Sequence, residues 1–138
     1  MNRWFVDTYY LVALLSPDDE GHARALAFAR NGRGRFFTTQ WIFTELLDGL
    51  ADTAYRSSSV DFLVAFTGEA NVAVIPASDD WFIRGLRLYQ DRPDKEWSLT
   101  DCISFLVMKD LGLQEALTAD HHFEQAGFTA LLKDKPTP

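Results

Sequence analysis

The sequence has 138 residues, of which 47% are hydrophobic and 14% aromatic; this is enough apolar material for one ordinary domain and excludes a disordered or fibrous chain. The 13 basic and 20 acidic residues give a formal net charge of −7, which excludes a protein that binds nucleic acid through bulk positive charge. The single cysteine, Cys102, can form no intrachain disulfide, so nothing in the cysteine content indicates an oxidising compartment.

The beginning of the chain carries no recognisable targeting segment. The apolar run from Leu11 to Leu15 is too short for the core of a signal peptide. No stretch approaches the roughly 18 continuous apolar residues that a membrane helix requires. We therefore expect a soluble, cytoplasmic protein without membrane contact, mature from its first residue and folded as a single domain over residues 1–138.

Short apolar or β-branched runs alternate along the chain with helical patterns. In chain order, the sequence predicts a strand at 4–6, helices at 10–15 and 21–30, a strand at 35–38, helices at 39–53 and 58–67, a strand at 72–75, helices at 79–90 and 100–111, and strands at 116–118 and 128–132. Parallel neighbouring strands need long crossovers, which helices usually provide. The alternation therefore predicts an α/β fold with a mainly parallel sheet covered by helices on both faces.

Four acidic residues fall at one expected edge of this sheet. Asp7 and Asp120 end predicted strands, and Glu45 and Asp101 lie early in helices that start on the same edge. Ligands of open parallel sheets bind beyond the carboxyl ends of the strands. The pattern therefore predicts that the four carboxylates converge.

Each of these acids also has a purely structural interpretation. Asp7 is suited to cap the following helix, and Ser98 with Asp101 has the spacing of a capping box. Asp120 begins a polar run that fits an ordinary loop. Glu45 lies on the polar side of its helix, where solvation alone tolerates acids. Taken singly, none of the four identifies a site.

Taken together, four carboxylates require compensation by protons or cations. At separations of about 5 Å each pair would repel by roughly 3 kcal/mol at an effective dielectric constant of 20. Oxygen ligands select hard ions such as Mg²⁺ or Mn²⁺, and one or two such ions would activate water for attack on a phosphodiester. Two divalent ions would also change the formal charge from −7 to −3, which eases the approach of a polyanion.

The acids lie in four short motifs, namely Phe5-Val6-Asp7-Thr8, Thr44-Glu45-Leu46-Leu47, Ser98-Leu99-Thr100-Asp101, and residues 117–123 with 126–128. Their order and spacing, over nearly the whole chain, resemble those of the PIN-domain ribonucleases, particularly the toxins of VapC-type toxin–antitoxin pairs and their stand-alone relatives. The resemblance implies a three-layer α/β/α fold in which Asp7, Glu45, Asp101 and Asp120 bind Mg²⁺ or Mn²⁺ and hydrolyse RNA to a 5′-phosphate and a 3′-hydroxyl. Thr8 and Ser98 would then orient a carboxylate or a water.

The same resemblance implies RNA as a partner and is compatible with an antitoxin and with a homodimer. Aromatic and aliphatic side chains at 62–66 and 81–89 fit either a core or a surface for self-association. The sequence does not separate these two interpretations.

A basic stretch and a histidine pair are further candidates. Residues 21–44 contain no acid, and they carry the candidate RNA contacts Arg24, Arg30, Arg33 and Arg35. This stretch fits a phosphate-contacting patch beside the site or a solvated helix face and turn. The pair His121-His122 is not expected to bind a metal, because adjacent side chains of a helix point in different directions, and zinc is not expected.

Two other functions compete with a nuclease. A haloacid-dehalogenase-like phosphatase or a receiver domain would also place an aspartate after the first strand, although such phosphatases resemble Asp-x-Asp and this chain has Tyr9 at that spacing. A PIN-fold binding module, with dispensable chemistry, would serve an antitoxin or an RNA-processing complex. The chain has neither a G-x-x-x-x-G-K-[ST] nor a G-x-G-x-x-G pattern, which argues against a nucleotide triphosphatase and a nicotinamide enzyme.

Overall fold

A parallel sheet forms the centre of the structure, a computed structural model that describes residues 2–30 and 33–133. In this part of the chain the strands are β1 (Asn2–Val6), β2 (Gly34–Thr39), β3 (Val72–Ile75), β4 (Glu115–Leu117) and β5 (Thr129–Ala130). Their spatial order is β3-β2-β1-β4-β5, and every pair is parallel. Strand β1 is therefore central, with Phe5 in register with Phe37 on one side and Ala116 on the other.

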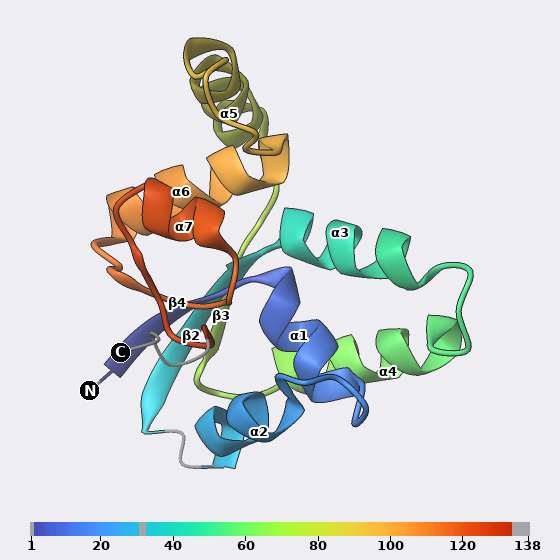
Figure 1. Ribbon diagram of the computed structural model, residues 1–138. Coiled ribbons are helices and arrows are strands. Elements are labelled where there is room, and N and C mark those ends of the chain that lie inside the picture. The colour runs from blue at the N-terminus through green and yellow to red at the C-terminus, as the bar shows by residue number, and fades with distance from the viewer. Residues whose placement is uncertain (1, 31–32, 134–138) are drawn as a thin grey trace.

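Helices flank the sheet on both faces. They are α1 (Thr8–Leu15), α2 (His22–Arg30), α3 (Gln40–Leu50), α4 (Arg56–Thr67), α5 (Asp79–Asp91), α6 (Leu99–Leu111) and α7 (His121–Gln125). In Figure 1, α6 and α7 lie on one side of the sheet and α1, α2 and α4 on the other, while α5 packs on α6 and stands away from the sheet. This arrangement confirms the predicted α/β/α fold. No helix in the described residues is long and apolar enough to cross a membrane.

Several predicted elements need correction, among them the helix predicted at 39–53, which covers Gln40–Leu50. The first helix begins at Thr8, because Asp7 in extended conformation is its N-cap. The last strand covers only Thr129–Ala130. Helix α7 was not predicted, since five residues are too few to show helical periodicity. Asp120 caps α7 and does not lie in an ordinary loop.

Aromatic rings anchor α7 to the rest of the core. Phe123 is fully buried, and its ring centroid lies 6.3 Å from that of Phe5 and 4.9 Å from that of Phe105. Phe105 also packs edge-on against Trp97, 5.0 Å away, just before α6. These contacts hold the first residue before α7, Asp120, at a fixed place relative to β1 and α6.

Helix α5 packs closely on α6 at Gly85, and we expect Gly85→Ala to destabilise the fold. A Cβ atom at this position would lie 2.3 Å from Cγ1 of Ile103. Overpacking of this kind costs about 1–3 kcal/mol, which should appear as a lower free energy of unfolding in urea. The matched control is Gly49→Ala in α3, where no heavy atom lies within 4 Å; helix propensity should stabilise it by about 0.5–1 kcal/mol. Equal stabilisation of both variants would contradict the close packing.

Candidate active site

Pairing of the strands brings Asp7 and Asp120 to the same edge of the sheet. Asp7 directly follows β1 and is 6% exposed. Asp120 follows β4, the neighbour of β1 in the sheet, with Val6 and Leu117 in register. The Asp120 carboxylate accepts a hydrogen bond from the backbone N–H of His122 over 2.9 Å. Two of the four predicted acids therefore lie beyond adjacent strand ends.

Glu45 reaches this edge from the other neighbour of β1. Strand β2 leads directly into α3, whose N-cap Thr39 accepts a hydrogen bond from the backbone N–H of Ile42. Glu45 lies in the second turn of this helix. Its Oε1 atom accepts a hydrogen bond of 2.5 Å from the hydroxyl of Thr8, the residue after Asp7. Thr8 thus lies beside a carboxylate of the acidic set and donates to it, and the orienting role that the resemblance implies stays a prediction.

Asp101 is a helix cap and a member of the acidic cluster at once. It forms a capping box with Ser98, whose hydroxyl accepts from the Asp101 backbone N–H at 3.0 Å. The Asp101 Oδ2 atom accepts from the Ser98 backbone N–H at 3.1 Å and lies 3.1 Å from Nδ1 of His122. The interpretation of Asp101 as a helix cap is therefore correct. It does not exclude the interpretation of Asp101 as a metal-binding carboxylate.

Thr118 and His122 complete the cluster, and the sequence did not predict either of them. The buried Thr118 hydroxyl donates to Oδ2 of Asp7 over 2.7 Å and accepts from the backbone N–H of Asp120 over 3.1 Å. His122 places Nδ1 between Asp101 and Asp120, 3.4 Å from Oδ1 of the latter. Their positions inside the last acidic motif were the available signal, because that motif surrounds Asp120.

Burial and mutual repulsion raise the pKa values of three of these carboxyl groups. Burial raises the pKa of Asp7 to about 7, and the charges of Glu45 and Asp101 add to the increase, against hydrogen bonds from Thr118 and the Thr8 backbone. Burial likewise raises the pKa of Glu45 and of Asp101, with Asp120 contributing to both. In the described part of the chain, no lysine or arginine forms an ion pair with any of the four. The cluster therefore holds an excess of negative charge.

The pKa of Asp7 predicts how stability depends on pH in the absence of metal. The folded carboxyl, with a pKa of about 7 against an ordinary value of 3.8, binds its proton more tightly than the unfolded one. This tighter proton binding stabilises the folded protein fully below pH 4. The stabilisation is lost as the pH rises through 7, which lowers the free energy of unfolding by up to about 4 kcal/mol. In EDTA, the free energy of unfolding of Asp7→Asn should therefore exceed that of the wild type increasingly from pH 5 to pH 8 in urea titrations. A constant difference would contradict the buried-charge assignment.

The adjacent histidines do not point apart as predicted. Their ring centroids are 4.5 Å from each other with an angle of 51° between the planes. Nδ1 of His121 lies 3.7 Å from Oδ1 of Asp120, and one ligand atom each from Asp120, His121 and His122 lie within 4.8 Å of one another. The prediction that the two side chains diverge was wrong, because both rings turn back toward the carboxylate of Asp120, which caps α7.

The basic stretch is not brought to the carboxylates. Arg30 ends α2, Arg33 directly precedes β2, and Arg35 is the second residue of β2. The start of β2 lies at the edge of the sheet opposite to the edge where Asp7 lies. The guanidinium of Arg35 lies over the ring of Phe37, 5.4 Å from its centroid. Arg24 donates a hydrogen bond to the carbonyl of Lys133. Contact of these four arginines with RNA stays a prediction, but they do not flank the acidic cluster as a group.

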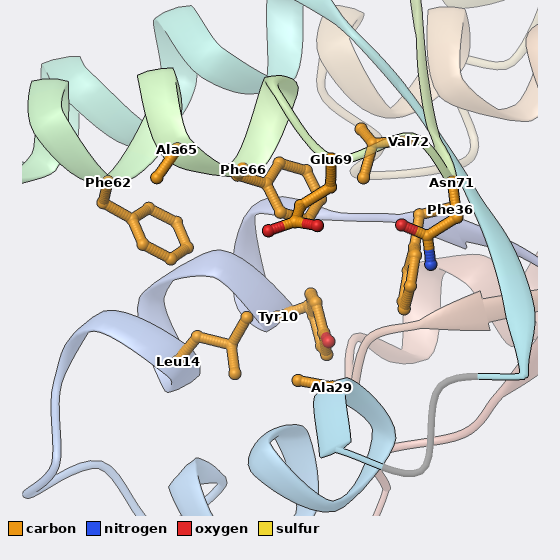
Figure 2. Close-up of a pocket in the computed structure, with 10 residues that line it drawn as sticks. All are labelled: Tyr10, Leu14, Ala29, Phe36, Phe62, Ala65, Phe66, Glu69, Asn71 and Val72. Carbon is orange, nitrogen blue, oxygen red and sulfur yellow. The ribbon is translucent and has the colours of Figure 1, made fainter.

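An apolar pocket of about 360 Å³ lies apart from the four acids. Figure 2 shows the rings of Tyr10, Phe62 and Phe66 and the carboxylate of Glu69 around it, between α1, α2 and α4. None of the four acids lines it. Helix α1 connects the two places, because Asp7 is its N-cap and Tyr10, one turn later, lines the pocket.

The family model of the PIN domain matches residues 4–129, and the chain therefore belongs to the PIN domain family. This confirms the resemblance seen in the four acidic motifs. It also replaces the interpretation as a haloacid-dehalogenase-like phosphatase or a receiver domain.

Solved structures with the same fold are toxins and toxin–antitoxin complexes. VapC20 of Mycobacterium tuberculosis, described as a sarcin–ricin loop cleaving toxin, is 24% identical with a TM-score of 0.82, over 92% of this chain and 97% of that one. VapBC2 from Rickettsia felis, bound to a promoter DNA fragment, is 11% identical with a TM-score of 0.65, over 93% of this chain and 96% of that one. DNA-bound VapBC from Salmonella typhimurium is 16% identical with a TM-score of 0.64, over 94% and 97%. No curated protein sequence matches the chain.

Proposed function

We propose that this protein is a metal-dependent endoribonuclease of the VapC type that acts on cytoplasmic RNA. The observation that carries the proposal is the convergence of Asp7, Glu45, Asp101 and Asp120 at one sheet edge without a lysine or arginine partner among the described residues. Burial there raises the pKa values of the first three, and the charges of neighbouring acids add to the increase. Membership of the PIN domain family and the fold shared with a sarcin–ricin loop cleaving toxin support it.

The donor set fits a hard divalent cation, Mg²⁺ or Mn²⁺, bound as one or two ions. Glu45, Asp101 and Asp120 each use one oxygen for the hydrogen bonds described above, and their second oxygens accept none from the described residues. Such an ion supplies a water of lowered pKa and neutralises charge on the phosphate.

The chain's own side chains would keep these carboxylates in place during the reaction. The Thr118 hydroxyl fixes Asp7, and the Thr8 hydroxyl fixes Glu45. The Ser98 backbone and His122 fix Asp101. With water as the nucleophile and the ribose 3′-oxygen as the leaving group, which takes up a proton, the products would carry a 5′-phosphate and a 3′-hydroxyl.

The first test is thermal unfolding in EDTA, Mg²⁺ or Mn²⁺, beside RNA cleavage under the same conditions. A ligand at about 100 times its Kd adds about 2.7 kcal/mol to stability, which for a domain of this size is a rise in Tm of about 5–10 °C. We expect this rise in the wild type and a much smaller one in Asp101→Asn, which keeps a capping side chain but loses the charge. Unchanged melting in all metals, together with no cleavage, would favour a PIN-fold binding module.

We also propose an antitoxin polypeptide as a partner. Two of the solved structures with this fold are VapBC proteins bound to DNA. In this chain, the pocket of Figure 2 offers apolar walls for side chains of a bound segment and one carboxylate, Glu69, for a basic residue of that segment.

A homodimer is the third part of the proposal. Helix α5 presents four large apolar side chains that are 43–52% exposed, namely Phe82, Ile83, Leu86 and Tyr89. Contiguous exposed apolar residues mark surfaces for association. Sedimentation of the wild type against Leu86→Glu tests whether this helix joins two copies.

A further inference from the structure

The side chains of Asp120, His121 and His122 have the spacing of a three-ligand site for a transition-metal ion. Oδ1 of Asp120 lies 3.7 Å from Nδ1 of His121 and 3.4 Å from Nδ1 of His122. Ligands placed about 2.0–2.1 Å from a tetrahedral zinc ion are about 3.3 Å from one another. Two edges of the required triangle are therefore already close to the ideal length, and one ligand atom from each of the three residues lies within 4.8 Å of the other two.

We propose that Asp120, His121 and His122 bind Zn²⁺, or a transition-metal ion of similar preference, with water as the fourth ligand. Imidazole nitrogen suits zinc, whereas Mg²⁺ prefers a set made of oxygen atoms alone. The site therefore differs in ligand chemistry from the carboxylate cluster beside it, although both use Asp120.

The third histidine and the cysteine of the described residues are less available to an ion. Nδ1 of His22 is 2.7 Å from the carbonyl oxygen of Ala13. Cys102 is buried, and burial raises the pKa of its thiol to about 11, which disfavours the thiolate that metals bind. The His121 side chain, in contrast, is 66% exposed and open to an ion from solvent.

Occupation of this site would alter the carboxylate cluster. Zinc on Nδ1 of His122 displaces the contact of that nitrogen with Oδ2 of Asp101, 3.1 Å away. Zinc bound to Oδ1 of Asp120 also occupies a carboxylate that the proposed Mg²⁺ or Mn²⁺ ion needs. Zinc would thus inhibit the nuclease by taking His122 and Asp120 together, a consequence that rests on the proposed function.

Zinc binding is tested by competition with a chromophoric chelator in excess Mg²⁺, which keeps the carboxylate cluster supplied with a hard ion. We expect one zinc per chain in the wild type, in Asp7→Asn, which damages the carboxylate cluster, and in the control His22→Asn. The affinity should fall by at least about tenfold in His121→Asn, a change at an exposed side chain that the fold tolerates. Absence of stoichiometric binding in the wild type, or equal affinity in His121→Asn, overturns the site.

Inhibition is measured separately, as RNA cleavage at increasing zinc relative to each variant's own rate without zinc. We expect half-inhibition to shift to at least about tenfold higher zinc in His121→Asn than in the wild type. Equal inhibition of the two proteins would show that zinc does not inhibit through this site. The result of the binding experiment would stand unchanged. The chelator experiment reads zinc alone, so a protein that cleaves no RNA still tests the site, and failure of the proposed function is seen separately.

Discussion

Replacement of Asp7 by asparagine is expected to reduce metal-dependent RNA cleavage by about a hundredfold to a thousandfold. Loss of a group that only orients a metal ligand costs about 10–100-fold in activity, and removal of a ligand should cost more. Asp7 is the most buried of the four acids, and it ends the central strand between the strands that lead to Glu45 and Asp120. Asparagine keeps the size of the side chain and the partner for Thr118 but removes the charge.

The rate is measured as initial cleavage of RNA in saturating Mn²⁺. Asp48→Asn is the matched control, because this acid lies exposed on α3 and outside the cluster; its rate should equal that of the wild type. Asp7→Asn should also fold at least as stably as the wild type in EDTA, since it removes a desolvated charge. Full activity of Asp7→Asn would remove the basis of the proposed site.

Phe123→Ala is expected to lower the free energy of unfolding by about 3–5 kcal/mol, as large-to-small changes of buried aromatic residues do. The ring is fully buried and contacts Phe5 of β1 and Phe105 of α6, so its loss leaves a cavity between three elements. Urea titration measures the effect. The cavity also frees α7, so that Asp120 and His122 lose their fixed positions and activity should fall under conditions where the variant is still folded.

Phe82→Ala on α5 is the control for this change. Its ring is 43% exposed, so in the monomer the loss should be within about 1 kcal/mol. A Phe123→Ala variant no less stable than Phe82→Ala would show that α7 is not anchored through its aromatic ring.

Local patterns were sufficient to predict the layered fold and the edge at which the acids gather. The last three residues of strand β1, Trp4 to Val6, are continuously apolar and buried, which is typical of a central parallel strand. The acids after β1 and β4 then had to lie together once these strands were neighbours. Asp101 shows the limit of such reasoning, since its sequence signature fitted a cap and a site equally. The structure shows the cap, and a role in a metal site stays a prediction.

Contacts between distant residues could not be predicted in the same way. The hydrogen bond between Thr118 and Asp7 depends on the pairing of β1 with β4, and the approach of His122 to Asp101 depends on how α7 packs on α6. The position of the arginines, however, was accessible. Arg35 begins a predicted parallel strand, and the start of such a strand lies at the edge opposite to its carboxyl end.

The bond between Thr118 and Asp7 also bears on when the protein can become active during its synthesis. It joins positions 111 residues apart, and β4 must insert beside β1 before it can form. A nascent chain that lacks β4 carries Asp7 and Glu45 but neither Asp120 nor the hydroxyl that orients Asp7. With the proposed function, assembly in this order would keep the protein inert toward the messenger and ribosomal RNA that surround it until most of its chain has been made.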